Sequence, residues 1–384
     1  MLCHLSKNLY NEGNFHIRQE YFKTKNWIRY NYLYHLLKHS HNYQQLPAKT
    51  AQQTLKILDR NWISYFNAFK KWQKDKSKFK AGPRIPKYKP KNGESLLVFT
   101  NQQVRIKDNY VKFPKKVGFK VRTRLSNTTN VREVRIIPKG VGYVVEIVYQ
   151  KSISPKLLNK DKIIAIDLGV RNLITAINNN GLNPFVIKGG VVKSINQYYN
   201  KEKARIQSVY DHQGITTGKA LKQLTNKRNK KIHYYFHKTS RKIIDYCVLN
   251  DMGTVVIGYN PDWKQNCHLG KKNNQNFVTF PFYKLVQQLN YKAEATGITV
   301  IKQEESHSSK CSFLDNEPIK HHEKYRGKRI SRGLFKSNKG IIINADVNGG
   351  YNIIKKAFLN AIIADRIEDV GLHPTRWRLG LATS

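Results

Sequence analysis

Residues 162–170 read KIIAIDLGV, and this stretch decides the fold of the second half of the chain. Residues 163–166 form an unbroken apolar run, as expected for a strand buried on both faces of a sheet. Asp167 then ends the run. An acid at the carboxyl end of a buried strand is typical of a functional residue, although an ordinary strand-end or turn aspartate is the alternative. The stretch therefore predicts a central strand with a candidate site at its end.

Strands and helices are expected to alternate around this strand. The predicted elements are strands at 172–181 and 183–190, a long basic helical region over about 192–250, a strand at 254–260, an amphipathic helix ending at Gly297, a strand at 298–305 and a helix directly after Asp346. This order matches an RNase H-like α/β domain.

The first half of the chain has a different pattern. Residues 1–80 are expected to be helical, because between residues 47 and 76 apolar residues recur at steps of three and four. A helix in a small bundle and a helix that contacts nucleic acid are both compatible with this pattern. A proline-rich basic arm follows at 82–93, and short alternating runs at 95–150 predict a small antiparallel barrel or sheet.

We therefore expect a multidomain protein of α+β and α/β class. The expected boundaries are 1–80 for a helical domain, 81–158 for a small β-barrel domain and 159–384 for the α/β domain, with a basic loop at 306–340.

The charge of the chain points to a polyanionic partner. Lysine and arginine number 69 against 25 acids in 384 residues, which gives a net charge of +44. Nucleic acid fits this excess, since each neutralised phosphate releases counterions. A membrane surface is the rival, but no long apolar segment is present. Candidate nucleic-acid contacts are Lys49, Lys56, Arg60, Lys80, Arg84, Lys87, Lys89, Arg228, Arg241 and Arg329.

The cysteines indicate a reducing compartment. Cys3, Cys247, Cys267 and Cys311 are too scattered for a disulfide framework, and no secretion signal opens the chain, so a cytoplasmic location is expected. Cys311 stands alone between histidines in the segment after residue 305, whereas zinc ribbons need paired ligands at close spacing. No zinc site is expected.

Three carboxylates are candidates for a centre that hydrolyses phosphodiesters with two metal ions. Such a centre needs converging acids, and Mg²⁺ prefers oxygen ligands. Asp167 and Asp346 are the first two, although Asp346 could instead cap the helix that follows it. The strand at 254–260 should lie beside the first strand, but it ends in Gly258 without an acid.

The next strand ends in Glu304 and Glu305. Because neighbouring residues on a strand point to opposite faces, one of the two glutamates is expected to reach the metals. Two exposed strand-end acids are the alternative.

The sequence resembles TnpB (OrfB), a family of transposon-encoded RNA-guided endonucleases related to the type V CRISPR effectors. The resemblance covers almost the whole chain. Its motifs are LCHLSKNLYNEGNFHIRQ (2–19), LPAKTAQQTLKILDRNW (46–62), GPRIPKYKPKNG (82–93), AIDLGVRNLITA (165–176), SINQYYNK (194–201), HKTSRKI (237–243), SSKCS (308–312) and NADVNGGYNI (344–353).

The resemblance implies a helical recognition lobe, a β-barrel wedge domain and a RuvC-type nuclease domain. It also implies a guide RNA, Mg²⁺ or Mn²⁺ as cofactor, and cleavage of double-stranded DNA beside a short adjacent motif. We expect a monomer with one RNA. Asp167 and Asp346 match the first and third catalytic acids of the family.

The chain departs from the family in three places. The second acid of the family normally ends the strand that here ends in Gly258, and Glu305, three residues before Ser308, fits a relocated position better than Glu304 does. The cysteines of a zinc ribbon are replaced by residues such as Ser312 and Asp315. The first wedge strand is missing, which suggests a shortened N-terminus.

Three functions follow from this reading. The favoured one is an active insertion-sequence nuclease that uses Asp167, Glu305 and Asp346. The first alternative, motivated by Gly258, is a nuclease-dead RNA-guided DNA-binding protein that acts as a transcriptional repressor. The second alternative is a transposition factor that binds DNA without RNA.

Overall fold

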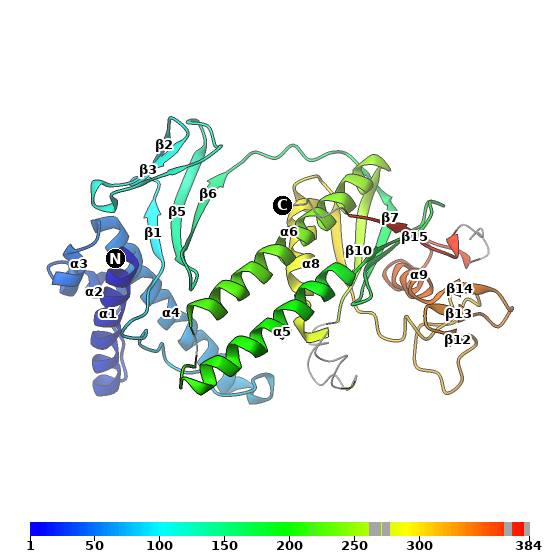
Figure 1. Ribbon diagram of the computed structural model, residues 1–384, viewed down its shortest axis with the longest axis horizontal. Helices are drawn as coiled ribbons and strands as arrows, with labels where there is room; N and C mark the ends of the chain where they lie inside the picture. The colour runs from blue at the N-terminus through cyan, green and yellow to red at the C-terminus, as the bar shows by residue number, and fades with distance from the viewer. Residues whose placement is uncertain (217, 261–269, 271–276, 365–370, 380–384) are drawn as a thin grey trace. The chain divides into compact units, whose positions relative to one another are not determined.

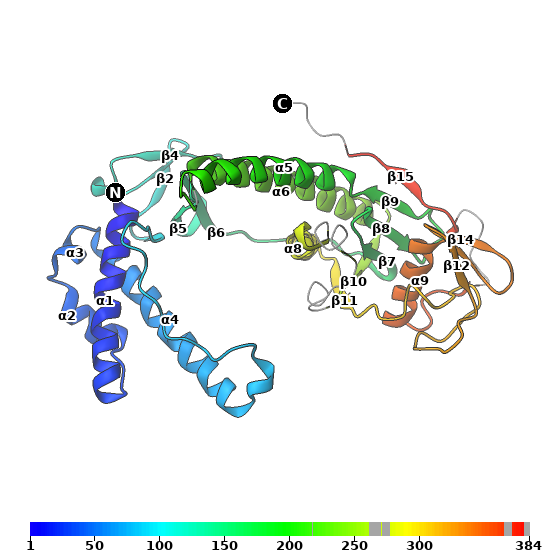
Figure 2. The same ribbon diagram turned by 60° about the horizontal axis from the view of Figure 1, so that its bottom comes forward.

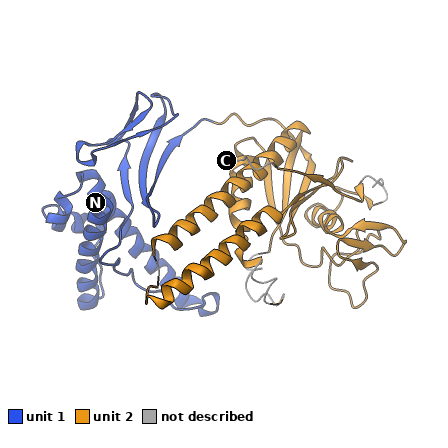
Figure 3. Ribbon diagram, viewed as in Figure 1, with its two compact units in different colours: residues 1–152 blue, residues 153–384 orange. Residues whose placement is uncertain are grey.

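The computed structural model describes residues 1–216, 218–260, 270, 277–364 and 371–379. The chain divides into two compact units, residues 1–152 and 153–384 (Figure 3). Both contain helices and strands, which confirms the predicted mixed α and β class. No helix in the described part of the chain is long and apolar enough to cross a membrane.

The first unit begins with helices. These are α1 (Leu2–Thr24), α2 (Tyr30–Leu37), α3 (His41–Gln44) and α4 (Ala48–Lys74), followed by a 3₁₀ turn at Lys76–Lys78 (Figure 1). The expected long helix is α4. It turns Ala51, Leu55, Leu58 and Trp62 inward, and all four are fully buried.

Two three-stranded antiparallel sheets follow. One has the order β1-β5-β6 and the other β2-β3-β4. Their strands are β1 (Leu97–Thr100), β2 (Arg105–Lys107), β3 (Tyr110–Lys112), β4 (Lys120–Arg122), β5 (Asn130–Pro138) and β6 (Tyr143–Gln150). Phe99 of β1 and Val134 of β5 share one hydrophobic core with the helices. The strands predicted for residues 95–150 are thus present, and their closure into a barrel stays a prediction.

The second unit is built on a six-stranded sheet with the order β11-β10-β7-β8-β9-β15. Its strands are β7 (Asn159–Leu168), β8 (Asn172–Asn178), β9 (Phe185–Lys188), β10 (Met252–Gly258), β11 (Thr299–Gln303) and β15 (Thr375–Trp377). β7, β8 and β9 form an antiparallel meander, and β10 and β11 add in parallel beside β7. This is the strand order predicted from residues 162–305.

Helices cover both faces of this sheet (Figure 2). The side chains of Ile164 and Ile166 enter a core formed with α5 (Gly190–His212), α6 (Lys219–Leu249) and α8 (Phe282–Glu294). Ile163 and Ala165 enter a second core on the opposite face, formed with α9 (Ala345–Ala357). The alternation along β7 therefore assigns every second residue to the α9 face.

Two features differ from the sequence-based expectation. The predicted loop at 306–340 contains β12 (Lys328–Ser331) and β13 (Leu334–Lys336), which form an antiparallel sheet with β14 (Ile342–Asn344). These strands are short and largely exposed, so they lack the alternation that reveals a strand. β15 was also not predicted; Trp377 in it stacks on Phe185 of β9 with ring centroids 3.5 Å apart.

The cysteines that the structure describes are free thiols. Cys3, Cys247 and Cys311 are buried, and Cys267 lies outside the described residues.

Two adjacent glycines in α9 provide a test of how this helix packs on the sheet. A Cβ at Gly350 would overlap Cδ1 of Ile177 and lie 2.8 Å from its Cγ1, whereas a Cβ at Gly349 would meet its nearest atom only at 3.9 Å. Gly350→Ala should lower the free energy of unfolding by about 1–3 kcal/mol through overpacking. Gly349→Ala should be neutral or stabilising, since alanine favours a helix interior. Thermal or denaturant unfolding of the two variants measures this; equal effects would contradict the packing described here.

Candidate active site

Asp167 lies at the end of β7 and on the α9 face of the sheet. It follows Ile163 and Ala165 in the alternation, and both of these pack in the core beneath α9. In the meander it pairs with Thr175 of β8. In the parallel direction Ile166 pairs with Ile257 of β10, so the next residues, Asp167 and Gly258, stand side by side at the carboxyl rim.

Glu305 occupies the space beside Gly258. A Cβ at Gly258 would lie 2.5 Å from Oε2 of Glu305 and 2.7 Å from Cδ1 of Ile353. Gly258 is level with Gln303 of β11, two residues before Glu305. The backbone N–H of Glu305 donates to Oδ1 of Asn260 at 3.1 Å, and its carbonyl accepts from the Ser308 hydroxyl at 2.7 Å. The glutamate is thus held on both sides, with its carboxylate over the glycine.

Glu304 has other partners. Its carboxylate pairs with Lys356 of α9 and accepts from the Ser306 hydroxyl at 2.9 Å. The hydrogen bond from Lys356 is the main reason that the pKa of Glu304 falls to about 2. Both glutamates lie past the end of β11, so their partners and not strand alternation distinguish them: Glu304 pairs with Lys356, and Glu305 lies beside Gly258.

Asp346 approaches from α9, and it is not the helix cap. The cap is Asn344, whose side chain accepts from the backbone N–H groups of Asp346 at 3.0 Å and Val347 at 3.2 Å. The expectation that the helix begins after Asp346 is therefore wrong: Asp346 lies in its first turn, where the helix dipole favours a carboxylate. Because Asn344 provides the cap, the carboxylate of Asp346 is available for other contacts.

A chain of side chains from the meander orients Asp346. Asn172 of β8 donates to Oδ2 of Asp346 at 2.7 Å, and Lys188 of β9 donates to Oδ1 of Asn172 at 2.8 Å. Sequence reasoning did not single out either residue. Asn172 lies inside the family motif at 165–176, and this could have identified it as a site residue. Nothing in the sequence distinguishes Lys188 from the many other lysines.

A recess of about 450 Å³ joins the two aspartates to basic residues. Arg329 and Arg332, from the β12–β13 hairpin, line it together with Asp167 and Asp346. Arg329 lies 3.7 Å from Oδ1 of Asp346. In the described part of the chain no three His, Cys, Asp or Glu side chains stand close enough to share an ion as they are placed.

The acids of the rim influence one another electrostatically. The pKa of Asp167 is raised to about 8, first by burial and then by the charges of Glu305 and Asp346; Arg329 opposes this rise weakly. The pKa of Glu305 is raised to about 7, chiefly by burial and next by Glu304. Acids with raised pKa values in a recess are typical of functional sites, because the charged form lacks a partner.

The other candidate cations are distributed over both units. Lys49, Lys56 and Arg60 are exposed on α4. Lys56 and Arg60 line a hollow of about 720 Å³ together with Arg29 and Tyr30, and Lys56 lies over the Tyr30 ring. Cations beside a half-buried aromatic ring suit contacts to a nucleic-acid backbone and base.

The basic arm at 82–93 is fixed along α1. Lys7 donates to the carbonyl of Lys91 at 2.8 Å, and Asn11 exchanges two hydrogen bonds with the backbone of Lys89. Lys80, Arg84 and Lys87 are exposed, whereas Lys89 is half-buried with its amine over the Tyr10 ring. The arm therefore presents its charges from an ordered backbone.

Arg228 and Arg241 have partners within α6 and its surroundings. Arg228 donates to Oδ1 of Asn196 at 2.7 Å and to the carbonyl of Thr279 at 2.7 Å, and burial lowers its pKa. Arg241 pairs with Asp245 one turn along α6. Arg228 thus has structural contacts that the sequence did not indicate, while Arg241 is exposed.

Comparison with known proteins gives two family matches. Residues 144–264 match the OrfB_IS605 family, described as a probable transposase, and residues 282–353 match the Cas12f1-like TNB domain. Between them these segments contain Asp167, Gly258, Glu305 and Asp346.

Individual proteins are similar over longer stretches. The TnpB-like protein ORF457 of Acidianus two-tailed virus is 25% identical over 400 residues, which cover 93% of this chain and 82% of the viral protein. The CRISPR-associated endodeoxyribonuclease Cas12f1 of Sulfoacidibacillus thermotolerans is 26% identical over 236 residues, covering 59% of this chain and 53% of that enzyme.

The fold is also similar to a solved structure. A Cas12f1–sgRNA–target DNA complex superposes with a TM-score of 0.57 at 16% identity, covering 92% of this chain and 81% of that chain. The chain is thus similar both to the OrfB_IS605 family and TnpB-like proteins and to Cas12f1 proteins, in keeping with the resemblance to TnpB and the type V effectors.

Proposed function

We propose that this protein is an RNA-guided DNA endonuclease of an insertion sequence, with Asp167, Glu305 and Asp346 as its catalytic carboxylates. It would cut double-stranded DNA beside a short adjacent motif, with the guide RNA reading the sequence by base pairing. One observation carries the assignment of the site: the Glu305 carboxylate lies where the side chain of residue 258 would begin. Glu305 thus brings a carboxylate to the end of β10, where Gly258 has no side chain.

The donor chemistry suits Mg²⁺ or Mn²⁺. Asp167 and Asp346 line one recess and Glu305 lies beside Gly258 at the same end of the sheet, and burial together with the charges of Glu305 and Asp346 disfavours the ionised form of Asp167. A divalent ion bound there would activate water and stabilise the leaving oxygen. Asn172 orients Asp346 for this task, and Arg329 supplies a positive charge beside it that can meet a DNA phosphate.

The remaining surfaces suit a guide RNA and a DNA duplex. The net charge of +44, the ordered arm at 82–93 and the exposed cations of α4 provide sequence-independent contacts to phosphates. Within this proposal the first unit contains the recognition helices and the wedge strands, and the second unit is a RuvC-type domain of RNase H-like fold. One chain with one RNA is the proposed assembly.

A nuclease-dead, RNA-guided DNA-binding protein is the second candidate, because β10 ends in Gly258. Glu305 and its supporting hydrogen bonds argue for the nuclease, since a decayed centre has no need of a buried carboxylate in that space. Sequencing of the RNA that copurifies with the protein tests whether it is RNA-guided at all. One enriched transcript is expected for the nuclease and for the nuclease-dead protein, and none for a DNA-binding factor that works without RNA.

Glu305 and Glu304 form a matched pair for testing the site. Glu305→Gln should reduce guide-dependent DNA cleavage to background, because it removes a metal-binding charge, while guide RNA and DNA binding stay intact. Glu304→Gln should retain cleavage, since Glu304 is paired with Lys356. A metal-dependent cleavage assay with guide RNA and matched duplex measures both. Cleavage that persists in Glu305→Gln would remove Glu305 from the site.

Gly258 tests whether the glutamate depends on the space beside it. Gly258→Ala should displace the Glu305 carboxylate and lower the cleavage rate by about 100-fold, the cost of a misplacement of about 1 Å. A swap of Gly258→Glu with Glu305→Gly moves the acid to the end of β10 and should restore part of the activity. If the alanine variant cuts at the normal rate, the close approach of the two residues has no catalytic role.

Asp167 predicts a dependence of stability on pH. Its pKa is higher in the folded chain than the ordinary value of 3.8, so the folded form binds an extra proton between about pH 4 and pH 8. Raising the pH through this window therefore removes stability. Without divalent metal, Asp167→Asn should raise the melting temperature at pH 8.5 more than at pH 4.5, and Mg²⁺ should stabilise the unaltered protein more at pH 8.5.

The control for this measurement is Asp161→Asn, an exposed acid at the start of the same strand. It should shift the melting temperature little at either pH. A lower melting temperature for Asp167→Asn at pH 8.5 would contradict the raised pKa.

A further inference from the structure

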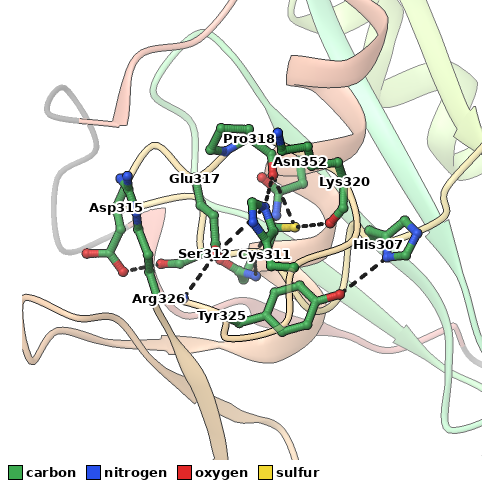
Figure 4. Close-up of polar contacts among 12 residues, drawn as sticks. His307, Cys311, Ser312, Asp315, Glu317, Pro318, Lys320, Tyr325, Arg326 and Asn352 are labelled. Carbon is green, nitrogen blue, oxygen red and sulfur yellow. Dashed lines mark hydrogen bonds and ion pairs between the residues drawn. The ribbon is translucent and has the colours of Figure 1, made fainter.

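The segment after β11 has a set of side chains that differs from the zinc ribbon of the family that it resembles. Ser312 and Asp315 stand where zinc-binding cysteines are expected, and the remaining candidate donors are directed elsewhere (Figure 4). The thiol of Cys311 faces the carbonyls of Pro318 and Lys320, each at 3.5 Å. Zinc therefore does not fit the residues that the structure describes here.

The nearby histidines are also engaged. His322 lies 2.8 Å from the carbonyl of Pro318, and His307 faces the hydroxyl of Tyr325 at 3.4 Å. His322 shares the carbonyl of Pro318 with the Cys311 thiol, and its Nε2 lies 4.0 Å from Oε1 of Glu317. Even so, no three donors among the described residues are placed to hold one ion.

A buried carboxylate cross-links the segment instead. Glu317 is 1% exposed. Its Oε2 accepts from the backbone N–H of Ser312 at 2.7 Å, and its Oε1 accepts from the backbone N–H of Arg326 at 2.9 Å. The Glu317 side chain thus joins two backbone segments, at Ser312 and Arg326, that are 14 residues apart in the sequence. Hydrogen bonds to a buried charge are stronger than neutral ones, so this link is strong.

Asp315 makes a second link on the other side. It accepts from the Ser312 hydroxyl at 2.5 Å and from the backbone N–H of Asn338 at 2.7 Å. Arg326 lies just before β12 and Asn338 just after β13. The two acids therefore hold the base of the β12–β13 hairpin at both legs.

The hairpin held in this way carries the basic residues of the active-site recess. Arg329 lies on β12 beside Asp346, and Arg332 lies at the turn between the strands. The segment is also attached to α9, because Asn348 and Asn352 both donate to the carbonyl of Cys311, at 2.9 and 2.8 Å. Movement of the hairpin base would thus shift Arg329 relative to the helix that carries Asp346.

We propose that Asp315 and Glu317 form a metal-free clamp that positions Arg329 and Arg332 at the active-site recess. The part of this inference that concerns DNA cleavage rests on the proposed function. Glu317 is a positioning residue, since it acts through the hairpin and does not line the recess. The clamp replaces an ion by charge-assisted hydrogen bonds to the backbone.

The test uses the full chain and compares Glu317→Gln with Glu323→Gln, an exposed acid of the same segment. The first readout is amide hydrogen exchange, which needs no nuclease activity. Glu317→Gln should speed exchange at Ser312, at Arg326 and along 328–336 by about 10- to 100-fold, the usual effect of losing a charge-assisted hydrogen bond. Glu323→Gln should leave exchange unchanged. Elemental analysis should find far less than one zinc per purified chain.

The second readout is guide-dependent cleavage. Glu317→Gln should lower kcat about tenfold while guide RNA affinity and KM for DNA stay unchanged, because the arginines are displaced from the site. Arg329→Gln combined with Arg332→Gln should cause a similar loss, and adding Glu317→Gln should lower kcat no further, since the clamp acts through these two arginines.

One bound zinc per chain, or unchanged hydrogen exchange in Glu317→Gln, would overturn the clamp. If hydrogen exchange changes in Glu317→Gln but the losses of kcat from the Glu317 and arginine variants add up, the clamp does not act by positioning the arginines. If the unaltered protein does not cut DNA, the proposed function fails, while hydrogen exchange and zinc content still decide whether the clamp exists.

Discussion

The parallel register between β7 and β10 is the constraint on which the site depends. Because Ile166 pairs with Ile257, Asp167 and Gly258 reach the carboxyl rim side by side and on the α9 face. A slip of one residue would turn Asp167 toward the core beneath α6 and α8, where no other acid of the site could reach it. Burial of the apolar run 163–166 holds this register. The same residues therefore build the core of the sheet and fix the position of Asp167.

Given this register, Glu305 can approach the end of β10, which has no acid of its own. β11 is one strand further from β7, about 4.8 Å beyond β10, and a glutamate two residues past its end has the reach to return to the rim. It can do so only if the intervening residue has no side chain, because Glu305 Oε2 and a Cβ at position 258 would be 2.5 Å apart. Gly258 and Glu305 are therefore two halves of one arrangement, and neither is interpretable alone.

The sequence predicts those parts of the structure that depend on periodicity. The buried run of β7 and the order of the strands follow from periodicity, whereas Glu304 and Glu305 lie past the end of β11, where strand alternation does not apply. Periodicity says nothing about side-chain partners, which is why Asn172 and Lys188 were missed and why Asn344, two residues upstream, was overlooked as the cap that frees Asp346. β12 and β13 were missed because most of their residues are exposed and the strands are short. Phe335 of β13 packs in the core beneath α9, while Asp315 and Glu317 hold the base of the hairpin.

The charges around the rim distinguish it from the rest of the molecule. Some other acids of the described chain are neutralised by lysines: Asp251 pairs with Lys162, Glu304 pairs with Lys356, and the pKa of each acid is lowered by its lysine. Among the described carboxylates, those with a raised pKa are Asp167 and Glu305. In a chain with a net charge of +44, lysines and arginines are abundant, yet Arg329 stays 3.7 Å from Asp346 and only weakly offsets the charge on Asp167. Burying acids without a partner costs stability, so their persistence here argues for a cation supplied from outside the chain.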